Sequence, residues 1–231
     1  MTTSQTTTGV RRWLIRETLA TAMVAVTLFI PAWRLDWVWG WALVGVYALW
    51  VATNALLLIP RSPGLLAERA RARESSKTWD KTLMGIVGLT TIAKHVVAGL
   101  DFRLGWTADL PLPVHLAALV IALLGYALVA WAMASNAFFS TLYRLQEDRG
   151  HAVAQGGPYR IVRHPGYVGT ILFELSTPLL LGSWWAFIAG GLAALLFVVR
   201  TALEDRTLQA ELVGYEDFAA QVRYRLLPGI W

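Results

Sequence analysis

Long apolar runs separated by short polar segments dominate the chain. Runs of the length that a membrane helix requires, about 20 residues, occupy residues 14–32, 38–59, 83–100 and 114–134. A further run, residues 167–199, is too long for one crossing and contains Pro178 and Gly182, which are natural break points. We therefore expect a tight helical hairpin there. The pattern predicts an all-α, polytopic integral membrane protein with five to six transmembrane helices, five if the hairpin is only re-entrant.

The composition supports this prediction and excludes other classes of protein. Of the 231 residues, 56% are hydrophobic and 15% are charged. A soluble globular domain carries roughly 25% charged residues, so this chain has too few charges to be one. A disordered chain has a low hydrophobic content, so disorder of the whole chain is excluded as well. The chain has no cysteine, so it contains no disulfide, no thiolate metal site and no cysteine nucleophile.

The distribution of basic residues predicts the topology. Of the 20 Lys and Arg residues, only Arg34 and Arg103 fall between spans on one side of the membrane, and Lys94 lies within a span. Because cytoplasmic loops carry the basic excess, both termini are expected in the cytoplasm. The membrane itself is expected to be a prokaryotic inner membrane. The net charge of +5 then reflects topology and anionic lipid headgroups rather than nucleic-acid binding. The Thr-rich residues 1–10 are expected to be disordered and are not a cleavable signal.

Two regions differ in character. Residues 1–135 contain four spans and read as an N-terminal transmembrane scaffold, whereas residues 136–231 contain the chemistry-bearing segments. The polar segment 136–165 is rich in glycine and proline, and the last span continues as an amphipathic helix that Gly214 ends. Chemistry is therefore expected at the cytoplasmic end of the spans.

The densest polar cluster is residues 156–167. Pro165 is suited to the first turn of a helix, on which His164, Tyr167 and Glu174 share roughly one face. A carboxylate inside a span, such as Glu174, is a functional candidate. The alternatives are a hydrogen-bonded strut between helices or a protonated acid, and His164 alone could be a capping or interfacial residue.

A second cluster lies where the last span leaves the membrane. The Arg200 guanidinium could bind a carboxylate or phosphate there, although Arg200 and Glu204 are also spaced for an intrahelical ion pair. Asn136 and Ser140 could line a polar pocket or bond only to backbone. Lys94 and His95 could form a proton or ligand site, snorkel outward or pack with polar neighbours. The four scattered histidines argue against a metal site.

Three motifs carry a resemblance to a known family. They are Gly157-Pro-Tyr-Arg-Ile-Val-Arg-His-Pro-Gly-Tyr-Val-Gly169, Arg200-xxx-Glu204-Asp205-xx-Leu208 and Tyr224-Arg-Leu-Leu-Pro-Gly-Ile-Trp231. Together they resemble the isoprenylcysteine carboxyl methyltransferase family and, more loosely, the phosphatidylethanolamine N-methyltransferases. The resemblance covers residues 136–231, and the combined pattern is specific.

The resemblance implies an integral membrane methyltransferase that uses S-adenosylmethionine as cofactor, enclosed by the polar segment and the C-terminal helices. It assigns cofactor contacts, and the residues that it implies are Gln146, His151, Ala152, Val153, Ala154, Tyr159, His164, Pro165, Gly166, Tyr167 and Glu204. Arg200 and Glu204 would be the catalytic residues. Arg200 would face the methyl acceptor, and Glu174 and Asn136 are further candidates for contact with it. Asp205 stands where the family usually has a second glutamate.

The expected acceptor is a lipophilic small molecule or lipidated group, most simply a carboxylate, because in-line methyl transfer to a carboxylate needs no general base. Membrane lipids are the other expected partner. Two alternatives come from different classes. One is an NADPH-dependent membrane reductase related to sterol reductases. The other is a non-catalytic transport or assembly protein, for which Lys94, His95 and Glu174 could mark a pathway within the spans.

Overall fold

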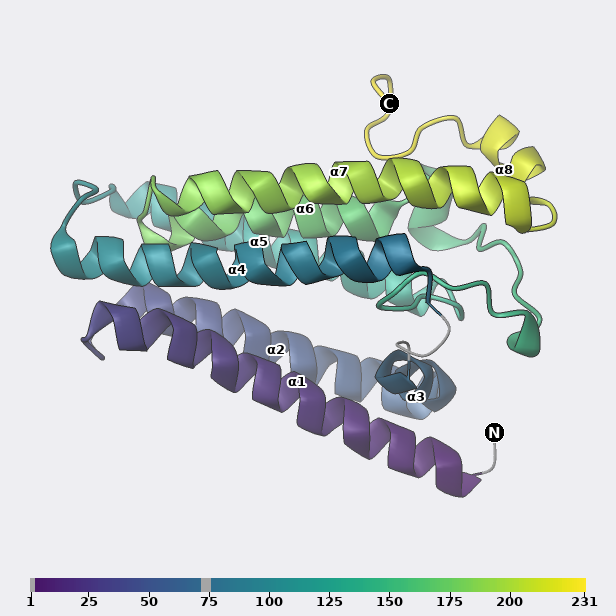
Figure 1. The fold of residues 1–231 in the computed structure, drawn as a ribbon, viewed down its shortest axis with the longest axis horizontal. Helices are drawn as coiled ribbons and strands as arrows, with labels where there is room; N and C mark the ends of the chain where they lie inside the picture. The colour runs from purple at the N-terminus through teal and green to yellow at the C-terminus, as the bar shows by residue number, and fades with distance from the viewer. Residues whose placement is uncertain (1–2, 72–75) are drawn as a thin grey trace.

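The computed structural model describes residues 3–71 and 76–231, and this part of the chain is helical without a strand (Figure 1). The α-helices are α1 (Thr3–Ala32), α2 (Val38–Arg61), α3 (Pro63–Arg71), α4 (Thr78–Leu104), α5 (Leu112–Ala134), α6 (Pro165–Leu181), α7 (Ala186–Glu211) and α8 (Tyr215–Gln221). Two 3-10 turns, η1 (Glu147–Arg149) and η2 (Gly157–Arg160), lie between α5 and α6.

Five of the described helices are long and apolar enough to cross a membrane: α1, α2, α4, α5 and α7. The predicted all-α, polytopic membrane fold is thus confirmed. The long apolar run is indeed a hairpin, because α6 ends at Gly182, whose φ of 76° is left-handed, and α7 begins at Ala186. With 17 residues, α6 is about 25 Å long, which is shorter than the five helices that are long enough to cross a membrane.

The expectation of disorder in residues 1–10 is wrong for the described part, since α1 already begins at Thr3. The reason is tertiary packing. Trp13, 1% exposed, packs in one cluster with Leu65 and Leu66 of α3. A Cβ on Gly9 would collide with Ala67, so the two backbones approach closely there. The short helix α3 stands between the second and third spans, and its apolar side is buried against α1.

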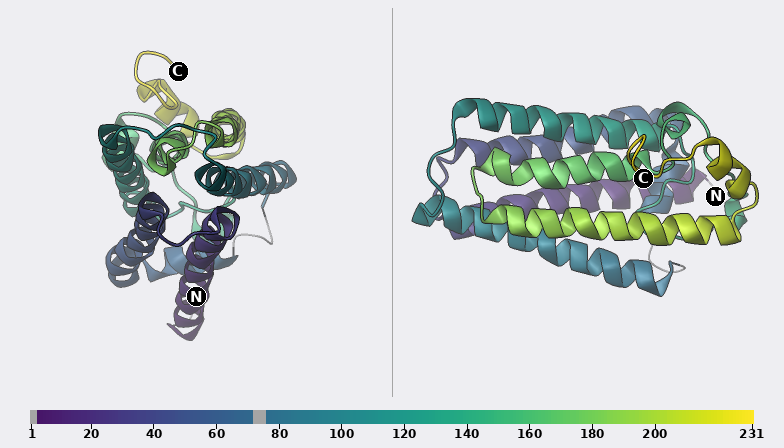
Figure 2. Two further views of the ribbon diagram at one scale, coloured as in Figure 1. Left: turned by 90° about the vertical axis from the view of Figure 1, so that its left-hand side faces the viewer. Right: turned by 90° about the horizontal axis from the view of Figure 1, so that it is seen from above.

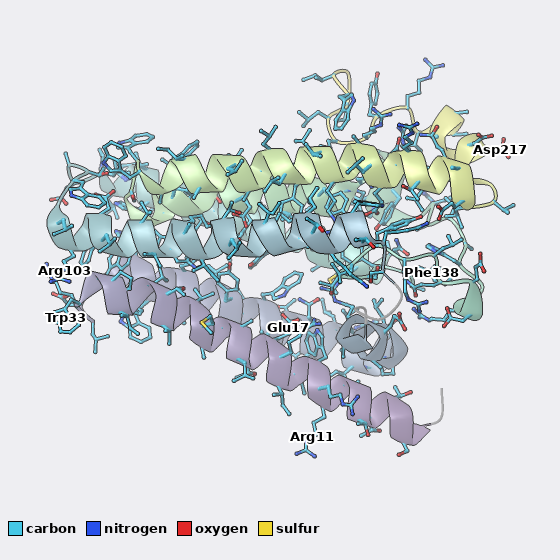
Figure 3. All side chains as sticks on the ribbon, in the orientation of Figure 1. Arg11, Glu17, Trp33, Arg103, Phe138 and Asp217 are labelled. Carbon is cyan, nitrogen blue, oxygen red and sulfur yellow. The ribbon has the colours of Figure 1, made fainter. Side chains whose placement is uncertain are left out.

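The long helices form one elongated bundle, seen from its end and from above in Figure 2. The α1–α2, α4–α5 and α6–α7 connections lie at one end, and α3, α8 and the segment 136–165 lie at the other (Figure 1). The labelled side chains of Figure 3 show the same division, with Trp33 and Arg103 at the first end and Phe138 and Asp217 at the second. The segments predicted to be cytoplasmic therefore share one end of the bundle.

Glycines set how closely the helices around α6 approach. A Cβ on Gly125 of α5 would lie 2.6 Å from the Gly169 carbonyl oxygen of α6, and one on Gly190 of α7 would lie 2.7 Å from the Glu174 carbonyl oxygen. Membrane helices pack through such small residues because lipid provides no hydrophobic drive between them. This close packing brings the start of α6 against α5 and α7.

Glu174 and Lys94 form an ion pair between α6 and α4 inside the bundle. Their Oε2 and Nζ atoms are 2.5 Å apart, and the side chains are 7% and 0% exposed. The structure thus places Glu174 in the strut that was one of its two structural alternatives, and Lys94 among polar neighbours rather than at the surface. His95, beside it, lies 3.3 Å from the Thr27 hydroxyl of α1.

Removing one partner of this pair should destabilise the fold. Lys94→Met leaves the Glu174 carboxylate buried without its cation, and we expect the free energy of unfolding to fall by about 3–5 kcal/mol. The double variant Lys94→Met, Glu174→Met should recover most of that loss. Chemical unfolding in detergent measures both, with Lys81→Met, at an exposed position of α4, as control. A double variant no more stable than the single one would contradict the prediction.

Candidate functional site

A cavity of about 280 Å³ lies at the end of the bundle that carries α3 and α8. Its wall combines the segment 136–154, the start of α6, the second half of α7 and α8. Its deeper wall is apolar and comes from the membrane helices, through Trp50 of α2, Met84 of α4, Tyr126 of α5 and Phe197 of α7. The cavity therefore joins a polar region to an apolar one between the spans.

Most of the residues that the sequence singled out line this cavity. They are Asn136, Ser140, His151, Ala152, Val153, Ala154, Tyr159, His164, Gly166, Tyr167, Arg200 and Glu204. The fold brings them together from three separate stretches of sequence. Their roles toward a cofactor or acceptor stay predictions, but their common location agrees with the expected site at this end of the spans.

Three predicted site residues do not line the cavity. Gln146 is fully buried, and its Nε2 donates to the Phe138 carbonyl oxygen at 2.7 Å. This hydrogen bond joins two parts of the polar segment outside the cavity lining. Pro165 begins α6. Glu174 lies deeper, in its ion pair with Lys94.

Asp205 of α7 is the most heavily bonded carboxylate at the site. It is fully buried and accepts hydrogen bonds from Arg163 Nε at 2.7 Å and Arg225 Nε at 2.8 Å. The Tyr215 hydroxyl donates to it at 3.0 Å, and His164 Nε2 lies 3.2 Å away. Burial and the nearby Asp205 charge raise the pKa of Tyr215, so that the phenol remains a donor.

The C-terminal tail is also attached through its backbone. The amides of Arg163 and His164 donate to the carbonyl oxygens of Tyr224 and Arg225, at 2.9 and 3.0 Å. Arg163 Nη1 adds bonds of 2.8 Å to the carbonyl oxygens of Val222 and Arg223. The three motifs of the sequence are therefore parts of one bonded unit.

Arg200 is held by Asp80 of α4, not by the Glu204 spaced one turn away. The guanidinium donates from Nε and Nη2 to the two Asp80 carboxylate oxygens, at 2.7 and 2.9 Å, and both side chains are nearly fully buried. Asp80 also accepts the Tyr143 amide at 2.6 Å. The intrahelical pair that the spacing suggested is thus replaced by an ion pair between α4 and α7. Through the Tyr143 amide, the polar segment is bonded to the same pair.

Glu204 is left facing the cavity. The Tyr167 hydroxyl donates to its Oε2 at 2.5 Å, and His164 Nδ1 lies 3.9 Å from Oε1. The Tyr167 ring lies under the Arg200 guanidinium, 5.1 Å from its carbon. Glu204 is 17% exposed, so it offers a carboxylate that Tyr167 orients and that still has bonding capacity.

The segment 151–154 offers backbone groups. Residues 152–154 form no backbone–backbone hydrogen bond within the described chain, although they line the cavity. Half-buried amides and carbonyls normally find a partner. The segment is fixed at its start, where His151 Nδ1 accepts the Gln146 amide at 3.2 Å and the His151 ring stacks on Phe138. Burial, with Arg144 and Arg149 nearby, lowers the pKa of His151 below its usual value.

Residues 116–210 match the model of the isoprenylcysteine carboxyl methyltransferase (ICMT) family. This region of the chain is therefore similar to the ICMT family. A search of curated proteins found no match. The ICMT region runs from α5 through the second half of α7, and therefore contains the polar segment, the α6–α7 hairpin and most of the predicted site residues. The family and the apolar helices together indicate a membrane methyltransferase.

Four site residues went unnoticed as such in the sequence. Asp80 and Arg69 lie outside the ICMT region and match no motif, and Tyr215 lies beyond it. Arg163 stands inside the first motif, next to His164, but nothing local indicated its partner. The available signal for Asp80 was weak: an acidic residue among basic ones at the start of a span.

Neutralising the Asp205 carboxylate should release the tail. In Asp205→Asn, the buried Arg163 and the Arg225 guanidinium lose their charged acceptor, and we expect a stability loss of about 3–5 kcal/mol. Hydrogen exchange should locate it, with faster exchange in residues 222–231 than in the membrane helices. Asp217→Asn, at an exposed position of α8, is the matched control. Unchanged protection of the tail would contradict the role of Asp205.

The His151 ring should make stability depend on pH in a defined direction. Its folded pKa lies below the unfolded value of about 6.5, so the unfolded chain binds the proton more readily. The contribution of His151 to the free energy of unfolding is therefore fully present above about pH 6.5. It is lost as the pH falls below that value, by at most about 1.4 kcal/mol per pH unit. Thermal unfolding between pH 7.5 and 5.5 measures this. The dependence should be smaller in His151→Phe, and equal slopes would refute the assignment.

Proposed function

We propose that this chain is an integral membrane methyltransferase that transfers a methyl group from S-adenosylmethionine to a lipophilic acceptor, in the first instance a carboxylate. The single observation that carries the proposal is that the ICMT region supplies most of the polar wall of the cavity. The apolar wall of the same cavity lies between membrane helices. One site thus offers surroundings for a charged cofactor and for an acceptor from the bilayer.

The donor set fits S-adenosylmethionine. The cofactor carries an adenine, an ammonium, a carboxylate and a sulfonium, and a site for it needs both hydrogen-bonding backbone and anionic groups. The open amides and carbonyls of residues 152–154 can bind polar edges, and Glu204 provides a carboxylate for a cationic group. The cavity volume of about 280 Å³ lies near the lower end of the usual range for ligand sites, about 300–1,000 Å³. His151, Tyr159 and His164 would complete the binding surface.

The protein would act mainly by positioning and by excluding water. A bound cofactor supplies a methyl group on positively charged sulfur, and transfer to a carboxylate oxygen breaks the C–S bond and forms a C–O bond without moving a proton. The chain's own residues would hold the reactants in line. Tyr167 would fix the Glu204 carboxylate beside the cofactor, and Arg200, fixed and charge-compensated by Asp80, would line the path of the acceptor.

The acceptor would reach the site from the lipid. The lining side chains Trp50, Met84, Tyr126 and Phe197 come from four different spans, and an apolar chain between them would bury surface worth about 25 cal/mol per Å². A lipophilic small molecule or a lipidated group therefore suits this wall. The site would open to the cytoplasm of a prokaryotic inner-membrane protein with both termini inside.

Calorimetry of cofactor binding to the detergent-purified protein tests the proposal. We expect micromolar affinity for S-adenosylmethionine, about −8 kcal/mol, and none for NADPH. Glu204→Gln and Tyr167→Phe should each weaken binding by about tenfold, because they remove a charged hydrogen-bond partner or its orientation. Glu216→Gln, at an exposed position of α8, should bind as the wild type does. Folded protein that binds NADPH or neither cofactor would overturn the proposal.

A further inference from the structure

Arg69 of α3 is a buried cation of which two guanidinium nitrogens have no hydrogen-bond acceptor among the described residues. Its side chain lines the cavity, the residue is 9% exposed, and neither Nε nor Nη1 has a hydrogen-bond acceptor in the described chain. A buried charged group left unpaired costs free energy, so native structures rarely retain one without a reason. Its one ring contact is with Phe139, whose centroid lies 5.6 Å from the guanidinium carbon.

The backbone under Arg69 is held in place. Arg16 of α1 donates from Nη1 to the Arg69 carbonyl oxygen at 2.7 Å, and Leu65 and Leu66 bury the same helix against α1. The side chain is therefore presented by a fixed helix. The charged groups that face it are Glu17, which already pairs with Arg16 at 2.7 Å, and the cations Arg16 and Arg200.

Arg69 and Arg200 differ in what they can still bind. Both line the cavity, but Asp80 occupies two donors of Arg200 and neutralises its charge. Burial lowers the pKa of Arg69 to about 10, so its guanidinium is still protonated at neutral pH. Among the described arginines that line the cavity, it is the one that lacks a bonded carboxylate, and its planar donors match a carboxylate or another oxyanion.

We propose that Arg69 binds the carboxylate of the methyl acceptor, in addition to or in place of Arg200. This inference rests on the proposed function and names a residue for it outside the ICMT region. With the carboxylate on Arg69 and the apolar chain along the wall that includes Trp50 and Met84, an acceptor would contact the N-terminal helices while its reacting oxygen faces the cofactor region. Helix α3 then belongs to the acceptor site and determines which acidic lipophiles enter it.

The test compares wild type, Arg69→Gln, Arg69→Lys and the control Arg61→Gln, at an exposed position near the end of α2. One assay follows labelled methyl transfer to an N-acetylated S-prenylcysteine with a free carboxylate. A second measures the shift in melting temperature that this acid and its carboxamide produce in protein saturated with S-adenosylhomocysteine, so that no turnover occurs. Calorimetry of S-adenosylmethionine binding accompanies both.

We expect Arg69→Gln to raise KM for the acid by about tenfold or more with kcat and cofactor affinity little changed, and Arg69→Lys to have a smaller effect. The wild type should distinguish the acid from the carboxamide in the melting assay, and Arg69→Gln should not. Without ligand, Arg69→Gln should melt at or above the wild-type temperature, because it removes an unpaired buried charge.

The outcomes separate this inference from the proposed function. If Arg69→Gln keeps the wild-type KM and still prefers the acid, or if the wild type shows no preference for it, the role of Arg69 is wrong. A lower melting temperature of unliganded Arg69→Gln with unchanged acid preference would mean a structural role and would also overturn it. If the wild type binds no S-adenosylmethionine, the methyltransferase proposal fails. The preference for the acid over the carboxamide is then measured in protein without S-adenosylhomocysteine, and it still decides whether Arg69 binds the carboxylate.

Discussion

The buried carboxylate of Asp205 is the interaction on which the site depends. It accepts bonds from the first motif through Arg163, from α8 through Tyr215 and from the tail through Arg225. These segments also bury apolar side chains against the bundle, among them Tyr159 of the first motif and Phe218 of α8. A buried charge is costly unless its partners are complete, so the hydrogen bonds to Asp205 help to hold these segments, and with them the polar wall of the cavity, in place.

A second buried carboxylate joins this unit to the membrane helices before it. Asp80 of α4 fixes Arg200 of α7 and the amide of Tyr143. The bonded pair spans 120 residues of sequence. As a result, the ICMT region is not a separate body resting on a scaffold of spans. The cavity takes Trp50, Arg69 and Met84 from residues 1–135 as well.

The ion pairs that the two buried aspartates form with arginines also explain the distribution of charge around the cavity. Asp80 compensates Arg200, and Asp205 compensates Arg163 and Arg225. Glu204 faces the cavity with one oxygen bonded to Tyr167, and Arg69 faces it without a bonded acceptor at Nε or Nη1. A negative and a positive group are thus available to ligands of opposite charge, which suits the proposed pairing of a cationic methyl donor with an anionic acceptor in one cavity.

The sequence by itself determined the spans, the hairpin and the segments that carry chemistry. Span lengths are readable because the bilayer requires long apolar helices, and Pro178 and Gly182 marked the break in the long apolar run. The motifs likewise indicated His164, Tyr167 and Glu204. Only the tertiary structure decided the partners. Arg200 had Glu204 one turn away but bonds to Asp80, and Glu174 bonds to Lys94. Which charges meet depends on how helices far apart in sequence approach one another, and no local pattern encodes that approach.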